Sequence, residues 1–113
     1  MRVLVLVKAN KDSEAGVLPD KKILTEMGNF NEELVKAGVM LAGEGLRPSS
    51  KGARVRFSSG KRTVIDGPFT ETKELLGGYF LADCKDLDQA IELAQRVPLV
   101  SRGSVEIRPL VTQ

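Results

Sequence analysis

The chain is organised around one segment, Asp66-Gly67-Pro68-Phe69-Thr70-Glu71-Thr72-Lys73-Glu74, and the Leu75-Leu76-Gly77-Gly78-Tyr79-Phe80 that follows it. A strand predicted at residues 62–65 brings the chain to the Asp66 carboxylate, and the Gly-Pro pair then turns it sharply. An aromatic strand at residues 79–83 takes the chain back. Asp66 is therefore expected at a strand end, where it either lines a cleft between two opening strands or caps its own turn.

Apolar periodicity predicts two amphipathic helices. In residues 19–38, apolar side chains recur at three- and four-residue spacing, Pro19 suits the first turn, and Gly38 suits the left-handed end. In residues 86–97, Asp86 and Gln89 form a start that resembles a capping box. The predicted buried stripes are Ile23, Leu24, Met27, Phe30, Leu34 and Ala37 in the first helix, and Leu87, Ala90, Ile91, Ala94 and Val97 in the second.

The remaining apolar runs have the pattern of strands. They lie at residues 1–8, 39–46, 53–58, 62–65, 79–84 and 105–110, and a polar loop at residues 9–18 is a candidate lid. Right-handed crossovers put both helices on one face of a mainly antiparallel sheet. The predicted fold is therefore α+β and ferredoxin-like, βαββ(hairpin)βαβ, in a single domain over residues 1–113.

The sheet predicted here has a second face that no helix covers. In the first strand, Val3, Val5 and Val7 share one face, and Leu4 and Leu6 share the other, so both faces are apolar. The sequence predicts no third helix to bury the second face. We therefore expect a homodimer in which two sheets pack face to face.

Composition excludes several classes of chemistry. The chain has no histidine, which excludes Ser-His and Cys-His catalysis and any His-bound zinc, iron or haem. Its carboxylates show no recognisable ligand spacing, so we predict no metal and no cofactor. The single cysteine, Cys84, follows Asp83 and is expected to be an unreactive thiol in the core or at a strand end. The longest apolar run is Val3 to Val7, which predicts neither a signal peptide nor a membrane span; the expected location is the cytoplasm.

Charge is distributed unevenly although the net charge is only +2. Residues 47–62 contain six cations and no acid, whereas in residues 66–92 seven acids outnumber two lysines; the six cations are Arg47, Lys51, Arg54, Arg56, Lys61 and Arg62. This pattern fits strands that lie side by side, a self-complementary dimer surface, an anion site, or a solvated hairpin. Aromatic residues for base stacking are scarce, so nucleic acid is not an expected partner.

Five motifs in order carry a resemblance to a known family. They are Gly43-Glu44-Gly45-Leu46, Val64 to Glu74 around Asp66-Gly67-Pro68-Phe69, Gly77-Gly78-Tyr79, Asp86-Leu87-Asp88-Gln89-Ala90 and Val105-Glu106-Ile107-Arg108-Pro109. The chain resembles the YCII-related family in its DGPF-domain branch. The resemblance implies the dimeric α+β barrel, in which two ferredoxin-like sheets enclose a cavity. It also implies a link to extracytoplasmic-function sigma factors, beside which some members are encoded.

The resemblance carries only one site residue over to this chain. Members of the branch are often discussed as enzymes, and relatives in the wider family pair a histidine with the aspartate. This chain has no histidine, so only the aspartate carries over, onto Asp66. A mechanism that depends on a His-Asp pair does not fit this sequence.

Two functional hypotheses follow. In the first, the protein is an enzyme that acts on a small molecule in a cavity at the dimer sheet interface, with Asp66 as general acid or base. The residues predicted to orient a polar substrate are Glu44, Lys73, Tyr79, Glu106 and Arg108. In the second, the protein is a non-enzymatic regulatory or binding module that senses a metabolite or docks on a protein, such as an extracytoplasmic-function sigma factor, through its cationic stretch.

Overall fold

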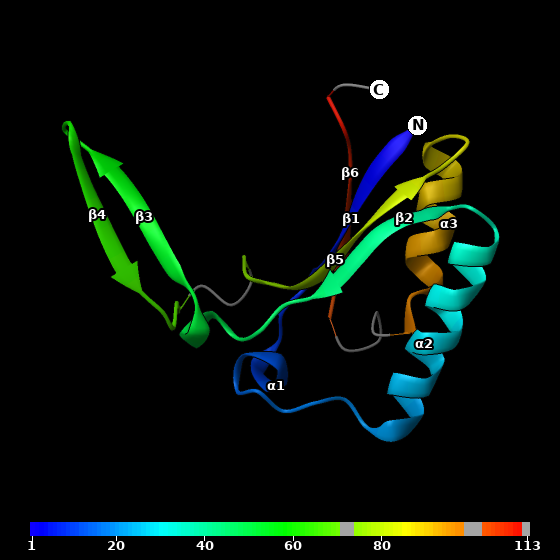
Figure 1. Ribbon diagram of the computed structural model, residues 1–113, viewed down its shortest axis with the longest axis horizontal. Coiled ribbons are helices and arrows are strands. Elements are labelled where there is room, and N and C mark those ends of the chain that lie inside the picture. Colours follow the sequence, from blue (N-terminus) through cyan, green and yellow to red (C-terminus); the bar gives the residue numbers. More distant parts are fainter. Residues whose placement is uncertain (71–73, 99–102, 112–113) are drawn as a thin grey trace.

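A computed structural model of the chain describes residues 1–70, 74–98 and 103–111 (Figure 1). The elements in chain order are β1 Arg2–Lys8, α1 Lys11–Glu14, α2 Lys21–Lys36, β2 Met40–Gly45, the 3-10 turn η1 Ser49–Lys51, β3 Ala53–Ser58, β4 Lys61–Asp66, β5 Leu76–Asp83, α3 Leu87–Arg96 and β6 Val105–Pro109. Four strands form an antiparallel sheet in the order β2-β5-β1-β6. With α2 and α3 packed on one face, this is the predicted ferredoxin-like α+β fold.

The hydrophobic core lies between this sheet and the two long helices. Its buried members are Val3, Val5, Phe30, Leu34, Phe80, Ala82, Cys84, Ala90, Leu93 and Val97. The rings of Phe30 on α2 and Phe80 on β5 meet edge to face, with centroids 6.3 Å apart. Burial of each large side chain of this kind contributes about 1.5–3 kcal/mol, so the core fixes the helices on this one face.

The helix predictions are confirmed in position and partly wrong in detail. The predicted stripes are buried at Phe30, Leu34, Ala90 and Val97, but Leu24, Leu87 and Ile91 are 48%, 42% and 41% exposed. In α3 Leu93 is buried and Ile91 is not, because the helix is rotated so that Ala90, Leu93 and Val97 point inward. Periodicity alone does not distinguish these two neighbouring stripes.

Side-chain caps explain where the helices begin. The Asp20 carboxylate accepts a hydrogen bond from the Ile23 N–H at 2.9 Å, so Pro19 precedes the cap instead of opening the helix. Asp86 caps α3 in the same way, by accepting from the Gln89 N–H at 2.9 Å, as predicted. After α2, Gly38 adopts a φ of +73°, which confirms the expected left-handed end.

Two boundaries differ from the prediction. The predicted loop at residues 9–18 contains α1, because Asn10 and Ser13 form a reciprocal capping box that starts a helical turn. The strand predicted from residue 79 begins at Leu76 and includes Gly77 and Gly78. A side chain at Gly78 would place its Cβ 3.2 Å from the Glu44 carbonyl oxygen, so these glycines belong to the sheet, where β5 and β2 approach closely.

The hairpin β3–β4, which we call the arm, projects from the rest of the molecule (Figure 1). Its strands pair only with each other, from Ala53 opposite Asp66 to Ser58 opposite Lys61. The strands before and after the Asp66-Gly67-Pro68-Phe69 turn therefore belong to different sheets. Asp66 is the last residue of β4, which confirms the predicted strand end. The expected cleft between this strand and the next is not formed by paired neighbours, because β5 pairs with β1 and β2 and leaves β4 with the arm.

Contacts from outside the arm hold the turn at its base. The Gly67–Pro68 peptide is cis, and the Gly67 N–H donates to the Gly52 carbonyl at 3.1 Å. The Phe69 N–H donates to the Ser49 Oγ at 3.0 Å. The Ser49 N–H donates at 2.9 Å to Glu14, and the Ser49 hydroxyl donates to the other oxygen of the same carboxylate. One residue of α1 thus orients the turn through Ser49.

Two further contacts at the turn are close. The Arg54 guanidinium lies 4.2 Å above the centre of the Phe69 ring. The Gly67 Cα faces the Ser49 backbone so closely that a Cβ at this position would lie 1.7 Å from the Ser49 carbonyl oxygen. Only glycine fits at residue 67 without moving the backbone.

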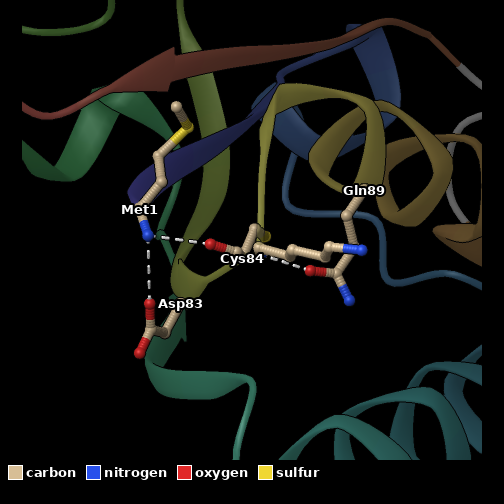
Figure 2. Close-up of polar contacts among 5 residues, drawn as sticks. Met1, Asp83, Cys84 and Gln89 are labelled. Carbon is tan, nitrogen blue, oxygen red and sulfur yellow. Dashed lines mark hydrogen bonds and ion pairs between the residues drawn. The ribbon is translucent and has the colours of Figure 1, made fainter.

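Cys84 lies at the end of β5 and is 2% exposed, which confirms the expected core thiol. Its carbonyl accepts a hydrogen bond at 2.8 Å from the chain's amino terminus, which also contacts Asp83 at 3.5 Å (Figure 2). Burial, and to a lesser degree the nearby charges of Asp83 and Asp86, raise the pKa of the thiol above its ordinary value of 9.0, although the amino terminus opposes this.

We expect Gly67→Ala to destabilise the protein by about 2 kcal/mol or more, because the new methyl group forces the Ser49 backbone away and strains the Phe69 hydrogen bond. The matched control is Gly45→Ala, since a methyl group added at residue 45 would meet no neighbouring atom within 4 Å. Urea unfolding of both variants measures the difference. Equal stability of the two variants would contradict the packing described at residue 67.

We expect Cys84 to react with iodoacetamide about a hundredfold more slowly in the native protein than in urea, because a buried thiol reacts through opening. The raised pKa also predicts a loss of stability at alkaline pH. The unfolded thiol ionises first as the pH rises past 9.0, so the unfolded state binds fewer protons and the free energy of unfolding falls. Equal labelling rates in the two states would show that the thiol is accessible.

Candidate functional site

Four of the predicted site residues share the sheet face that the helices leave open. Since Val3 and Val5 face the helices, Leu4 and Leu6 point to the other side, together with their cross-strand partners. One row of partners crosses this open face from β2 to β6: Glu44, Tyr79, Leu6 and Glu106. The next row is Ala42, Leu81, Leu4 and Arg108. The fold thus brings together Glu44, Tyr79, Glu106 and Arg108.

Ion pairs occupy one edge of the open face. The Glu106 carboxylate lies 3.7 Å from the Lys8 Nζ through one oxygen and accepts from the Arg108 guanidinium at 3.3 Å through the other. Such partly exposed pairs contribute at most about 1 kcal/mol each, so this cluster positions charge more than it stabilises the fold. At the opposite edge strand, the exposed Glu44 has no ion-pair partner among residues 1–70, 74–98 and 103–111.

Asp66 and Lys73 stand apart from this group. Asp66 is exposed at the base of the arm, opposite Ala53 and on the same arm face as Val55 and Val64. In the described part of the chain its carboxylate has no hydrogen-bond or ion-pair partner, so the neighbouring turn is held by Ser49 rather than by an Asp66 cap. Lys73 lies outside the described residues. The catalytic role of Asp66 stays a prediction.

A cavity of about 410 Å³ lies at the end of the sheet where β1 and β2 finish and β5 and β6 begin. We call it the sheet-end cavity. α1 and the segment between α1 and α2 form one wall, and the segment between β2 and η1 forms another. Its charged and bulkier lining residues include Lys8, Asp12, Leu18, Leu46, Arg47 and Pro48.

The lining combines apolar walls with a few charges. Val7, Leu18 and Leu46 supply apolar surface, and the side chains of Asn10 and Ser13 already satisfy each other in the α1 cap. Lys8, which pairs with Glu106, links the cavity to the open face. Among the lining residues that the structure describes, Arg47 and Asp12 have no ion-pair partner in the described chain.

Sequence reasoning missed most of this cavity. It proposed residues 9–18 as a lid, and residues from this segment do line the wall, but it did not single out Lys8, and Arg47 entered only as part of a cationic stretch. The signal that could have indicated the cavity was the loop composition, with Gly16 and Pro19 flanking two apolar residues between a strand and a helix.

Among the described residues, no group of three or more carboxylates or thiols is arranged to hold a metal ion. None of the described helices is long and apolar enough to cross a membrane.

Comparison with known proteins agrees with this fold. The chain is similar in structure to 5-chloro-2-hydroxyhydroquinone dehydrochlorinase (TftG) from Burkholderia phenoliruptrix AC1100, which was solved in complex with 2,5-dihydroxybenzoquinone. The similarity covers 97% of this chain and 93% of that chain, with 12% sequence identity and a TM-score of 0.55. At this identity the likeness concerns the fold alone. An uncharacterized protein of Rhizobium meliloti (strain 1021) is 38% identical over 93 residues, which span 80% of this chain and 75% of the relative. Since residues 1–112 also match the YCII-related domain, the resemblance is confirmed, and the chain belongs to the YCII-related family.

Proposed function

We propose that the protein binds a small organic molecule in the sheet-end cavity. The volume of about 410 Å³ is within the range of ligand pockets, and mostly apolar walls with few polar groups are typical of them. A protein of the same fold, the dehydrochlorinase, was solved with a small quinone. That likeness supports the capacity of the fold to hold such a molecule, and the residues of this chain have to supply the specificity.

The ligand preference that we propose follows from Arg47, a cation in the cavity lining without an ion-pair partner among the described residues. The lining offers two cations, Lys8 and Arg47, against one acid, Asp12, and Lys8 is already paired with Glu106. A guanidinium at an apolar cavity binds a carboxylate through two parallel hydrogen bonds, or an ionised phenol through hydrogen bonds to its single oxygen. The proposed ligand is therefore a compact apolar or aromatic molecule with one anionic group.

A second copy of the chain is part of the proposal. The open face presents Leu4, Leu6, Tyr79 and Leu81 as partly buried side chains, and packing against another sheet would remove their remaining surface from water. This homodimer would also enclose Glu44 and Tyr79. Their role in orienting a polar substrate, with Glu106, Arg108 and Lys73, belongs to this proposal.

In the enzymatic form of the proposal, Asp66, which does not line the sheet-end cavity, transfers a proton to a molecule held at the dimer sheet interface. The fixed turn beside it supports the idea of a positioned carboxylate, since Ser49 and Glu14 hold that backbone.

The alternative is a regulatory module that docks on a protein such as an extracytoplasmic-function sigma factor. The exposed cations Arg56, Lys61 and Arg62 of the projecting arm support that alternative.

We expect benzoate-like acids to raise the melting temperature of the protein more than the corresponding neutral amides. Arg47→Gln should weaken binding of the acid by about 10- to 100-fold, the worth of a charge-assisted hydrogen bond, and leave amide binding unchanged. Leu18→Trp should fill the cavity and abolish binding of the acid and of the amide. The control is Leu41→Trp, at a half-exposed residue of β2 outside the lining, which should leave binding unchanged. Calorimetric titration that shows equal binding to the Leu18→Trp and Leu41→Trp variants would exclude the cavity.

If the bound molecule is converted to a product, Asp66→Asn is expected to lower turnover by about a hundredfold or more while ligand affinity stays within twofold. The substitution removes the proton-transfer group from an exposed side chain, so folding is preserved. Single-turnover kinetics beside a binding titration separates the two effects. Turnover equal to that of the unmodified protein would remove Asp66 from the mechanism.

A further inference from the structure

The arm has an apolar strip that nothing in the described chain covers. Val55 and Val64 are cross-strand partners, and Phe57 lies two residues further along the same face. These three side chains are 51%, 66% and 70% exposed. An isolated pair of strands is only marginally stable in water, so this apolar surface is suited to contact another surface.

The arm is also basic. Arg56, Lys61 and Arg62 are exposed and have no acidic partner among the described residues, and the Arg62 guanidinium lies 5.7 Å from the centre of the Phe57 ring. The apolar strip thus has Arg62 beside Phe57 and Asp66 at the base of the arm, while Arg56 and Lys61 lie on the reverse face of the hairpin. Such a surface fits a partner that offers an apolar groove bordered by carboxylates.

The same chain offers such a groove at its other end. A cleft of about 260 Å³ between α3 and β6 is lined by Ile91, Ala94, Gln95, Val105 and Ile107. We call it the α3–β6 groove. Leu87 and Ile91, one helical turn apart, stand 42% and 41% exposed beside it.

Carboxylates border the α3–β6 groove. Asp88 and Glu92 each lie three residues before a lining residue, Ile91 and Gln95 respectively, and therefore on the adjoining helix surface, and both are exposed. Neither is paired with a cation in the part of the chain that the structure describes. The groove therefore matches the arm in both respects, apolar against apolar and acidic against basic.

The two surfaces cannot meet within one molecule. The longest dimension of the chain is 46 Å, and the arm and α3 lie at its opposite ends (Figure 1). The contacts of Ser49 with Glu14 and with Phe69 fix the base of the arm, so the arm has a set direction. In a second copy of the chain, the α3–β6 groove offers the arm both an apolar surface and opposite charges.

We propose that the arm of one copy docks in the α3–β6 groove of another, with Phe57 in the groove and Arg62, its cross-strand partner, facing Asp88 and Glu92. In a dimer with two-fold symmetry, each copy gives one arm and accepts one, so the contact forms twice. This surface is separate from the open sheet face. The arm thus has a role that neither its sequence pattern nor the proposed ligand binding requires.

Sedimentation velocity over a range of concentrations tests the apolar half of the contact. We expect Phe57→Ser and Ile91→Ser each to raise the dissociation constant about tenfold or more, since truncation of a central aromatic or aliphatic anchor has this effect. Val35→Ser is the matched control, because Val35 is 59% exposed on α2 and belongs to neither surface. Association that is unchanged by both test substitutions, as in contact through the open sheet face alone, would overturn the proposal.

Charge reversal tests the polar half and leaves the apolar strip intact. The variant with Asp88→Lys and Glu92→Lys should associate more weakly, and so should the Arg62→Glu variant, because Arg62 is the arm cation on the same face as Phe57. An equimolar mixture of the two variants should recover association, since both arm–groove contacts of the mixed dimer then pair opposite charges. Failure of the mixture to associate more strongly than either variant alone would overturn the proposal, as would an unmodified protein that stays monomeric at about 100 µM, the concentration that weak dimers need.

Discussion

The packing of α2 and α3 against a single face of the β2-β5-β1-β6 sheet is the constraint on which the other surfaces depend. Phe30 and Leu34 from α2 and Leu93 from α3 form one core with Val3, Val5 and Phe80 of the two central strands. The chain has no further long helix in its described part, so the opposite face keeps its leucines and Tyr79 at the surface. The same arrangement leaves the sheet end free to form a cavity.

Lys8 connects the two surfaces of the sheet that are proposed to bind, the sheet-end cavity and the open face. It is the last residue of β1, lines the sheet-end cavity, and approaches Glu106 on the open face at 3.7 Å. Charge placed in the cavity therefore acts on the same ion-pair cluster that holds Arg108. The residues that sequence reasoning selected on the open face and the cavity that it missed are neighbours in the folded chain.

The sequence predicted the parts of this structure that depend on local patterns. The helices at 21–36 and 87–96 and the strands around them follow from spacing and caps such as Asp86, and their order is enough to predict the ferredoxin-like fold. What it could not predict depends on long-range pairing. Asp66 was expected to line a cleft between two opening strands or to cap its own turn, whereas β4 pairs with β3 and β5 pairs elsewhere. The sheet-end cavity likewise takes lining residues from segments near residues 7, 17, 46, 77 and 103, which no local pattern relates.

The turn at the base of the arm has a consequence for protein engineering. Its geometry is set largely by groups outside the two strands: the Glu14 carboxylate, the Ser49 hydroxyl and backbone, and the Gly52 carbonyl that receives the Gly67 N–H. A foreign hairpin grafted between Ala53 and Asp66 would be held by the same contacts at its base, and it would project from the scaffold at the same angle as the native hairpin. The protein thus offers an exchangeable cassette on a small α+β scaffold, with Gly67 as the joint that has to stay glycine.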